Sequence, residues 1–374
     1  MFAGRELEYL EQCVRTGWVS SAGPLVDKFE DMVSRYVGSK YGVATVNGTA
    51  ALHLAMATVG VNAGDEVIVP AMSFIAPANA VRYMGASPIF IDVEPDYWQI
   101  DINLVADFLH DQCYANDEGT FNRETKRRVK AIIPVHILGH PVEMDSLLTL
   151  AREHNLIVVE DAAESLGAEY KNIRVGNFGD VACFSFNGNK IVTAGGGGML
   201  LTDNEHYAER ARHLSTQAKV DPIEYVHDEL GYNYRLTNIQ SALGCAQMEQ
   251  LEGFISTKRD IADRYTGAFL ETVGLTPMKE SSRAFCTYWL YTILIGRGAG
   301  IDSRKIMASL ADQGIQSRPL WQPLPYSPFE NTIHYRGFPV AERLYREALS
   351  LPSSTAMTTA DIDRVVDGIR ACLQ

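Results

Sequence analysis

The sequence is short of positive charge. Its 374 residues include 33 lysines and arginines against 46 aspartates and glutamates, a formal net charge of −13. A surface that binds nucleic acid or anionic lipid through its overall field needs the opposite balance. We therefore expect no nucleic acid and no membrane as partners, and any anionic ligand must be held by a local pocket.

Long apolar runs and paired cysteines are also scarce. No run approaches the roughly 20 apolar residues of a membrane-spanning helix. Residues 1–13 carry acidic side chains in a helical pattern, where a secretory signal would begin with basic residues and continue into an apolar core. The 6 cysteines are scattered, without a Cys-x-x-Cys pair or a zinc-ligand spacing. We predict a soluble cytoplasmic protein with reduced thiols.

The usual metal and nucleotide motifs are missing as well. His136 and His140 are close in sequence, but the residues around them indicate a strand end and a turn, so no metal site is expected. The glycine run 195–198 lacks the dinucleotide fingerprint, because Leu200 stands where its third glycine belongs, and no P-loop lysine follows. We expect these glycines to let the chain pass close to a ligand or a neighbouring subunit.

What the sequence does contain is a regular alternation of short β-rich runs and helical patterns over its first two thirds. This cadence predicts an α/β fold with a mostly parallel central sheet covered by helices on both faces. Between two of the runs, the polar stretch 116–128 predicts a surface loop. The runs predicted as strands are residues 41–46, 66–70, 88–93, 129–135, 156–160, 181–186 and 199–202.

The alternation of short β-rich runs and helical patterns ends near residue 246. We predict a large domain over residues 1–245 and a smaller α+β C-terminal domain over residues 246–374. Residues 239–265 predict one long amphipathic helix that joins them. The elements predicted in the smaller domain are a strand at 288–295 and helices at 303–313 and 359–373.

Polar residues follow several predicted strands at their carboxyl ends, where open α/β sheets bind ligands. The first group, Asn47-Gly48-Thr49, runs directly from a strand into a helix. Free backbone N–H groups at the helix start, together with the Thr49 hydroxyl, form a seat for a phosphate group. An ordinary helix cap is the alternative for the same residues.

Asp161 and Lys190 follow two further strands. A carboxylate at the end of an apolar strand is costly to bury without a cation, and a lysine beside such an acid suits Schiff-base chemistry. Helix capping by Asp161 and a surface position for Lys190 are the alternatives for each segment alone. A phosphate seat, an acid for a ring nitrogen and a Schiff-base lysine, in this order along a parallel sheet, describe a fold-type I pyridoxal-phosphate enzyme.

Further motifs extend this pattern over essentially the whole chain. They lie at residues 17–21 (GWVSS), 47–52 (NGTAAL), 64–70 (GDEVIVP), 134–136 (PVH), 160–164 (EDAAE), 188–190 (GNK) and 231–236 (GYNYRL). In these motifs the sequence resembles the DegT/DnrJ/EryC1/StrS family of sugar aminotransferases. The resemblance implies pyridoxal 5'-phosphate as the cofactor and a homodimer with shared active sites.

Carried over position by position, the resemblance implies a role for each matching residue. Lys190 would bind the cofactor as a Schiff base, and Asp161 would keep the pyridinium nitrogen protonated. Phe74 would stack on the ring, with core packing as its alternative, and Glu164 would lie near the ring hydroxyl. The phosphate-binding residues would be Gly48, Thr49 and Ser185, with Asn233 reaching the phosphate of the partner subunit.

The same resemblance implies a reaction. L-Glutamate would donate its amino group, Lys190 would shuttle the proton, and a nucleotide-linked keto-sugar would accept the amine. A non-catalytic relative would lack this lysine or Asp161, and the 3-dehydratases of the family carry histidine in place of the lysine, so neither is expected. The expected substrate-binding residues are Trp18, Asn233, Arg318 and Trp321, with a surface ion pair as the alternative for Arg318.

Two branches of the family compete for the substrate. Gly196, where most relatives carry an acid, and residues 351–357 look most like enzymes that aminate C4 of a UDP-linked 2-acetamido-4-keto-2,6-dideoxy sugar, for bacillosamine-type surface glycans. The Trp18 and Asn233 segments are shared with GDP-perosamine synthases, which aminate GDP-4-keto-6-deoxymannose. We predict the UDP-linked substrate, with the GDP-linked one as the alternative.

Overall fold

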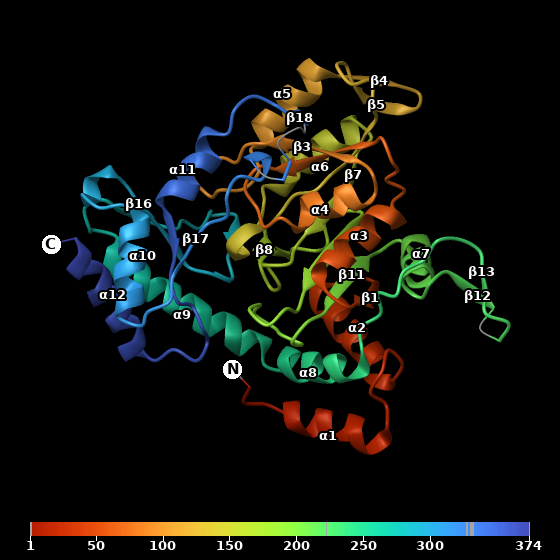
Figure 1. The fold of residues 1–374 in the computed structure, drawn as a ribbon, viewed down its shortest axis with the longest axis horizontal. Coiled ribbons are helices and arrows are strands. Elements are labelled where there is room, and N and C mark those ends of the chain that lie inside the picture. The colour runs from red at the N-terminus through yellow and green to blue at the C-terminus, as the bar shows by residue number, and fades with distance from the viewer. Residues whose placement is uncertain (1, 222, 327, 330–332, 374) are drawn as a thin grey trace.

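The computed structural model describes residues 2–221, 223–326, 328–329 and 333–373. Its centre is an eight-stranded sheet (Figure 1) in the order β1 (Tyr41–Thr45), β11 (Gly198–Thr202), β10 (Val181–Ser185), β7 (Ile157–Asp161), β6 (Val129–Ile132), β2 (Glu66–Pro70), β3 (Ser87–Ile91) and β18 (Ile333–His334). From β10 to β18 the neighbours run parallel, whereas β11 is antiparallel to both β10 and β1. The predicted α/β fold with a mostly parallel sheet is confirmed.

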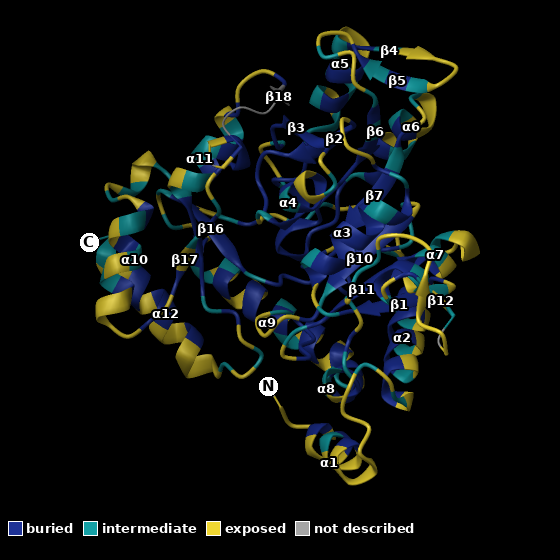
Figure 2. Cartoon of the chain, turned by 45° about the vertical axis from the view of Figure 1, so that its right-hand side comes forward, coloured by how far each residue is buried: buried dark blue, intermediate teal, exposed yellow. Residues whose placement is uncertain are grey.

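Successive residues of a central strand face opposite sides of the sheet, and both sides are buried. In β2, Val67 and Val69 belong to one apolar core, while Ile68 belongs to the other. All residues of this strand are buried. The strands therefore read as continuous apolar runs in the sequence, without polar alternation. Figure 2 shows the buried strands surrounded by helices whose outer faces are exposed.

Helices cover both faces of the sheet. Helices α3 (Gly48–Thr58) and α4 (Ala76–Tyr83) pack in the first core, and α5 (Ile102–Gln112) and α6 (Met144–Glu153) pack in the second. Asn47 begins α3, because its side chain accepts a 2.8 Å hydrogen bond from the N–H of Ala50. The other helices of this part are α1 (Glu6–Thr16), α2 (Pro24–Val37), α7 (Glu205–Ser215) and α8 (Asn238–Met248).

Residues after α8 build a smaller unit. It contains a four-stranded antiparallel sheet in the order β14 (Leu275–Pro277), β16 (Thr292–Ile295), β19 (Ala348–Ser350) and β17 (Arg318–Pro319). The predicted domain boundary between residues 245 and 246 stays a prediction. It falls inside α8, and β18, which comes later in the chain, pairs with β3 of the large sheet. The helices of this unit are α9 (Leu251–Phe269), α10 (Ser303–Asp312), α11 (Pro339–Glu347) and α12 (Thr359–Cys372).

Short elements decorate the described part of the chain. They are the hairpins β4 (Cys113–Asn116) with β5 (Gly119–Asn122) and β12 (Lys219–Asp221) with β13 (Val226–His227), the small sheet of β15 (Ala284–Phe285), β8 (Glu169–Tyr170) and β9 (Ile173–Arg174), and the 3-10 turns Ile137–Gly139, Arg297–Ala299 and Leu324–Tyr326. Among the described residues, no helix combines the length and the apolar character that crossing a membrane requires.

The single long helix predicted over residues 239–265 is wrong, because two helices occupy this stretch. Helix α8 ends at Met248 and α9 begins at Leu251. At the break, the side-chain amide of Gln250 donates to the carbonyl of Ala246 and to the carboxylate of Glu6. The apolar spacing continues across the break, so the periodicity does not reveal it.

Two other local predictions are wrong in part. The stretch 116–128 was expected to be a loop, but its first part, through Asn122, belongs to the β4–β5 hairpin, across which the rings of Tyr114 and Phe121 stack at 5.8 Å. The strand expected over 288–295 begins only at Thr292. Tyr288 has a φ of 46°, which lies outside the β region.

Candidate active site

The carboxyl ends of β7 and β10 meet the start of α3 at one cavity of about 350 Å³. Asp161 ends β7, Ser185 ends β10 and Gly48 opens α3. In an open α/β sheet this crevice outside the strand ends is the usual ligand site. The cavity is therefore the first candidate for the active site.

The start of α3 offers a seat for an anion. The first N–H groups of a helix have no intrahelical partner, and the side chain of Asn47 satisfies that of Ala50, while the N–H of Ala51 makes the first regular helical bond, to the carbonyl of Asn47. The N–H groups of Gly48 and Thr49 are left for a ligand. A Cβ on Gly48 would lie 2.8 Å from the Cβ of Ser185. Only glycine lets α3 approach β10 this closely.

The glycine run 195–198 passes beside this seat. A Cβ on Gly198 would lie 2.5 Å from the carbonyl oxygen of Asn47, and the N–H of Gly197 donates a 2.9 Å hydrogen bond to the carbonyl of Val46. Gly197 also has a φ of 116°, which favours glycine. The run lets the chain pass close to the backbone of the seat, while its contact with a ligand or another subunit stays a prediction.

Asp161 is a buried carboxylate with few partners. It is 4% exposed, and its Oδ1 accepts a 3.1 Å hydrogen bond from the N–H of Ala163. Burial raises the pKa of Asp161, although this hydrogen bond and the charge of Lys190 oppose the rise. A turn follows β7 here, so Asp161 caps no helix. An acid in this environment favours the binding of a cationic N–H group.

Glu160, one residue earlier, is bonded within the protein. Its carboxylate accepts hydrogen bonds from three N–H groups of residues 176–179 and lies 3.1 Å from Nε2 of His136. Burial alone would raise the pKa of Glu160, but the hydrogen bonds from His136 and the backbone lower it. Nδ1 of His136 accepts the N–H of Val142, so Nε2 carries the proton toward Glu160.

His140, the other histidine considered as a metal ligand, also bonds within the protein. Its Nδ1 donates a 2.8 Å hydrogen bond to the carbonyl of Pro141, and its Nε2 accepts a 3.1 Å bond from the N–H of Ser281. Burial lowers the pKa of His140 to about 4, so the ring is neutral. Both of its nitrogens are occupied.

One surface cluster has the chemistry of metal ligands. His213, Asp228 and Glu229 each place one ligand atom within 4.8 Å of the others. Arg210 holds Glu229 in two hydrogen bonds of 2.9 and 3.1 Å, and His213 lies 2.8 Å from Asp228. Ion pairing accounts for this cluster, and we assign no metal to it.

Lys190 reaches the cavity from the turn after β10. Its Nζ lies 3.7 Å from Oε1 of Glu164 and 3.8 Å from the ring centre of Trp289. Glu164 is 6% exposed and accepts a 2.8 Å hydrogen bond from the N–H of Leu138. Burial raises the pKa of Glu164 to about 7, against the opposing charge of Lys190. Lys190 is thus held inside the cavity between a carboxyl group and an indole face.

The structure brings most of the predicted residues to this one cavity. Phe74 is 52% exposed, which leaves its ring open to a ligand instead of packed in the core. Trp321, expected to bind substrate, also lies on the wall. The predicted residues that line the cavity are Gly48, Thr49, Phe74, Asp161, Glu164, Ser185, Lys190 and Trp321.

Trp18, Asn233 and Arg318 do not line this cavity within the single chain. Trp18 is exposed in the segment after α1. Asn233 is exposed and pairs with Thr216 beside the β12–β13 hairpin. Arg318 is exposed in β17, where it donates a 3.1 Å hydrogen bond to the carbonyl of Ser317. Their substrate-binding roles stay predictions, and that of Asn233 requires a partner subunit.

Trp289 is a wall residue that sequence reasoning missed. It comes from the segment before β16, which is far along the chain from both Lys190 and Phe74. The segment carries no motif or spacing that indicates a ligand. A lone tryptophan in an apolar stretch is usually a core residue, and only its contact with Lys190 reveals another role.

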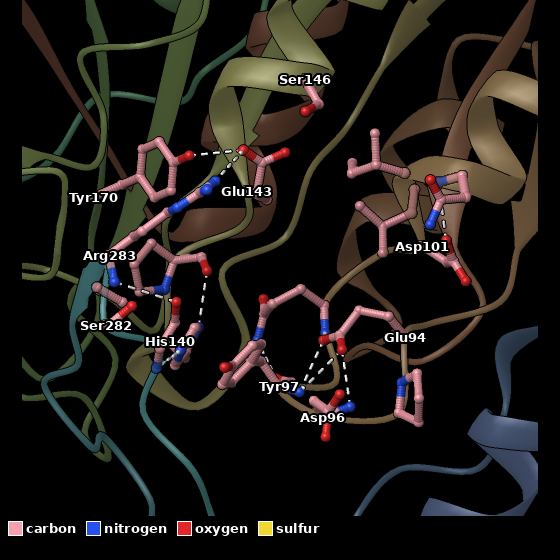
Figure 3. A pocket seen from close by; sticks show the side chains of 18 residues that line it. Glu94, Asp96, Tyr97, Asp101, His140, Glu143, Ser146, Tyr170, Ser282 and Arg283 are labelled. Atoms are coloured by element: carbon pink, nitrogen blue, oxygen red, sulfur yellow. Dashed lines mark hydrogen bonds and ion pairs between the residues drawn. The ribbon is translucent and has the colours of Figure 1, made fainter.

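A larger cavity, of about 600 Å³, lies between the loop after β3 and the loop before β15 (Figure 3). Its polar groups bond to one another. Glu94 accepts hydrogen bonds from the N–H of Tyr97, whose ring stacks on His140 at 5.1 Å, and Tyr170 donates a 2.7 Å hydrogen bond to Glu143. A ligand site needs polar groups that converge on its guest, so size alone does not make this cavity the active site.

Comparison with known proteins agrees with this geometry. A model of the DegT/DnrJ/EryC1/StrS aminotransferase family matches residues 2–370. The chain is 37% identical over 366 residues to a GDP-perosamine synthase of Escherichia coli, with 98% of this chain and 95% of that protein covered. It is 36% identical over 365 residues to a GDP-perosamine synthase of Caulobacter vibrioides, with 97% and 94% covered. The crystal structure of a DegT/DnrJ/EryC1/StrS aminotransferase from Brucella abortus superimposes with a TM-score of 0.89 at 28% identity, covering 98% of this chain and 95% of that one.

Proposed function

The chain belongs to the DegT/DnrJ/EryC1/StrS aminotransferase family, and we propose that it moves the amino group of L-glutamate to the keto carbon of a nucleotide-linked sugar. Pyridoxal phosphate is the cofactor of the family, and the protein is a nucleotide-sugar aminotransferase. The observation that carries the proposal is that Asp161, Lys190 and the unsatisfied start of α3 face one cavity.

The residues of the cavity fit this cofactor. A phosphate fits the free N–H groups of Gly48 and Thr49, and Ser185 adds a hydroxyl at the same place. The exposed ring of Phe74 suits the face of a pyridine ring. Asp161, whose pKa is raised by burial, gains a partner when a ring nitrogen carries a proton beside it.

In this arrangement pyridoxal phosphate supplies an electron sink for the α-carbon of the amino acid. Asp161 would keep a proton on the ring nitrogen. The amine of Lys190 would hold the cofactor covalently and, when free, would take and return the proton at the α-carbon of the amino acid. With a pKa of about 7, Glu164 can donate or accept a hydrogen bond at the ring hydroxyl near neutral pH.

The substrate side of the site is proposed to need two copies of the chain. Trp321 already lies on the cavity wall, whereas Trp18 and Asn233 are exposed away from it. A partner subunit that brings Asn233 to the phosphate would complete the seat at α3. The homodimer with shared active sites follows from this requirement.

For the sugar nucleotide we place the GDP-linked 4-keto-6-deoxy sugar first, supported by the names of the two relatives that cover nearly the whole chain. The UDP-linked 2-acetamido-4-keto-2,6-dideoxy sugar is the second candidate. It is supported by Gly196 and residues 351–357, which look like the UDP branch of the family.

The test is an absorption spectrum of the protein with pyridoxal phosphate, before and after L-glutamate, beside Lys190→Ala. We expect a visible band that glutamate bleaches in the wild type and that the variant does not form. GDP- and UDP-linked 4-keto sugars are then added to the bleached enzyme, and the better acceptor restores the band faster. Absence of a band in the wild type would refute the proposal.

A further inference from the structure

Trp289 forms part of the cavity wall and has no role in the reaction as described. It is buried, and its ring centre lies 3.8 Å from Nζ of Lys190. At this distance an aromatic face attracts an ammonium group. The indole N–H donates a 2.6 Å hydrogen bond to the carbonyl of Asn189, which fixes the ring against the residue before the lysine.

A second lysine holds the main chain at Trp289. Lys258 of α9 is 7% exposed, and its Nζ donates hydrogen bonds of 2.8 Å to the carbonyl of Trp289 and 2.7 Å to the carbonyl of Ser353. Both acceptors are neutral carbonyls, so the buried charge is costly. Burial lowers the pKa of Lys258 to about 8, in keeping with that cost.

The segment around Trp289 is held from several sides. Tyr288 adopts a φ of 46°, an uncommon conformation for a bulky residue, which the surrounding structure must maintain. The N–H of Thr287 donates a 3.0 Å hydrogen bond to the carbonyl of Gly139, and the N–H of Tyr291 donates a 3.1 Å bond to Oγ of Ser353. The indole is therefore placed by contacts from distant parts of the chain, and Lys258 is the charged residue that bonds to Trp289 itself.

We propose that Trp289 is the resting place of the Lys190 amine whenever that amine is not bonded to the cofactor, and that Lys258 is the residue that positions Trp289. The inference rests on the proposed role of Lys190. In each transfer the lysine must leave the cofactor, stay close and return. The indole face on one side and the Glu164 carboxyl group, 3.7 Å from Nζ, on the other keep the amine near while it is free.

The test measures how fast the full-length protein, stripped of cofactor, captures pyridoxal phosphate. In this step the Lys190 amine condenses with the cofactor aldehyde and releases water, and the visible band reports it; borohydride reduction and peptide mass confirm Lys190 as the site. We expect Trp289→Leu to slow capture about tenfold and Trp289→Phe, which keeps a weaker aromatic face, about threefold. Glutamate bleaching of the loaded variants should slow by similar factors.

Lys258→Met keeps the apolar stem and removes the ammonium. If Lys258 acts through Trp289, this variant slows capture to a similar extent as Trp289→Leu, and the double variant is no slower than either single one. Lys279→Met, at an exposed lysine of the same unit, should leave the capture rate unchanged.

Capture by Trp289→Leu at the wild-type rate would overturn the proposal. If that variant does not fold, as judged by circular dichroism, Trp289→Phe decides by the same criterion. Losses that multiply in the double variant would overturn the positioning role of Lys258. A wild type that captures the cofactor but is not bleached by glutamate refutes the proposed function instead, while the capture rates still decide on Trp289.

Discussion

Three acidic residues within one stretch of five residues have pKa values that are shifted in different directions. Glu160, Asp161 and Glu164 are all buried, yet the pKa of Glu160 is lowered and the other two are raised. The difference lies in the number of donors: Glu160 receives three backbone N–H groups and His136, whereas Asp161 receives one N–H. Glu160 is therefore a structural acid, and the other two are available to a ligand.

Glu164 should make the stability of the cofactor-free protein depend on pH. Its pKa is about 7 when folded and 4.5 at its ordinary value, so the folded state keeps a proton that the unfolded chain releases earlier. This stabilisation is present below pH 4.5 and is lost as the pH rises through 7, in total about 3 kcal/mol. Between pH 4 and pH 8, the free energy of unfolding of Glu164→Gln should therefore rise by about 3 kcal/mol relative to wild type, measured with urea.

The matched control is Glu118→Gln, at an exposed acid in the β4–β5 turn. Its unfolding free energy should follow the wild-type curve across the same pH range. Parallel curves for Glu164→Gln and wild type would show that folding does not shift the pKa of Glu164 and would contradict this prediction.

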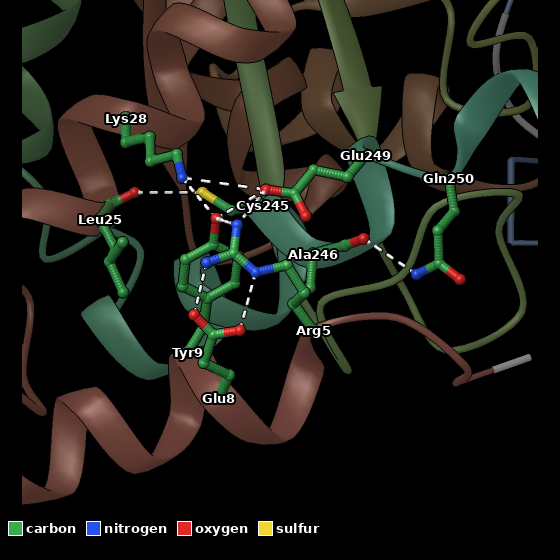
Figure 4. A network of polar contacts seen from close by, with 9 residues as sticks. All are labelled: Arg5, Glu8, Tyr9, Leu25, Lys28, Cys245, Ala246, Glu249 and Gln250. Carbon is green, nitrogen blue, oxygen red and sulfur yellow. Dashed lines mark hydrogen bonds and ion pairs between the residues drawn. The ribbon is translucent and has the colours of Figure 1, made fainter.

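At the scale of elements, helix α1 is attached to the rest of the chain around one hydroxyl group (Figure 4). The hydroxyl of Tyr9 accepts hydrogen bonds from Lys28 at 2.6 Å and Arg5 at 3.0 Å, and it donates one of 2.6 Å to Glu249. Glu249 lies at the break between α8 and α9. The attachment therefore joins the N-terminal helix to the break between α8 and α9, where the smaller unit begins.

Tyr9→Phe should remove these three bonds without changing the packing of the ring. Because two of the partners are cations and one is a carboxylate, we expect a loss of about 2 kcal/mol in the free energy of unfolding. Urea unfolding followed by circular dichroism measures it. Tyr114→Phe is the control, since its hydroxyl makes no hydrogen bond with the described residues, and an unchanged midpoint for Tyr9→Phe would contradict the attachment.

At the scale of the whole molecule, the single chain leaves a conspicuous apolar edge near the β12–β13 hairpin. Ile223 and Leu230 are each 81% exposed, in the same stretch that carries Asn233. Apolar side chains gathered in this way mark a contact with another protein. The proposed homodimer would give this edge a partner and would bring Asn233 to the active site of the other subunit.

Ile223→Glu combined with Leu230→Glu should weaken the homodimer, because charges would be buried without partners at the contact. We expect the dimer dissociation constant to rise at least about tenfold. Light scattering after gel filtration, from micromolar protein downward, measures the mass. Val273→Glu changes an equally exposed residue after α9 and should leave the dimer intact. A wild type that runs at 41.3 kDa would contradict the homodimer.

The sequence by itself determined the α/β fold and indicated that Gly48, Asp161 and Lys190 each lie at or after the end of a strand of the sheet. These features depend on local physics: strand burial shows as apolar runs, and strand ends in a parallel sheet share one edge. The helix break after α8 could not be predicted from the sequence, because a short interruption leaves the spacing of apolar residues unchanged on both sides.

Only the tertiary structure decided which residues act together across the chain. It gave Glu160, but not Asp161, hydrogen-bond donors from residues 176–179 and from His136, and so made the two acids differ in pKa. It also placed Trp289 against Lys190 and held it with Lys258. These contacts join segments far apart in sequence, and the pKa of a buried group depends on every donor and charge around it, so no local pattern could have shown them.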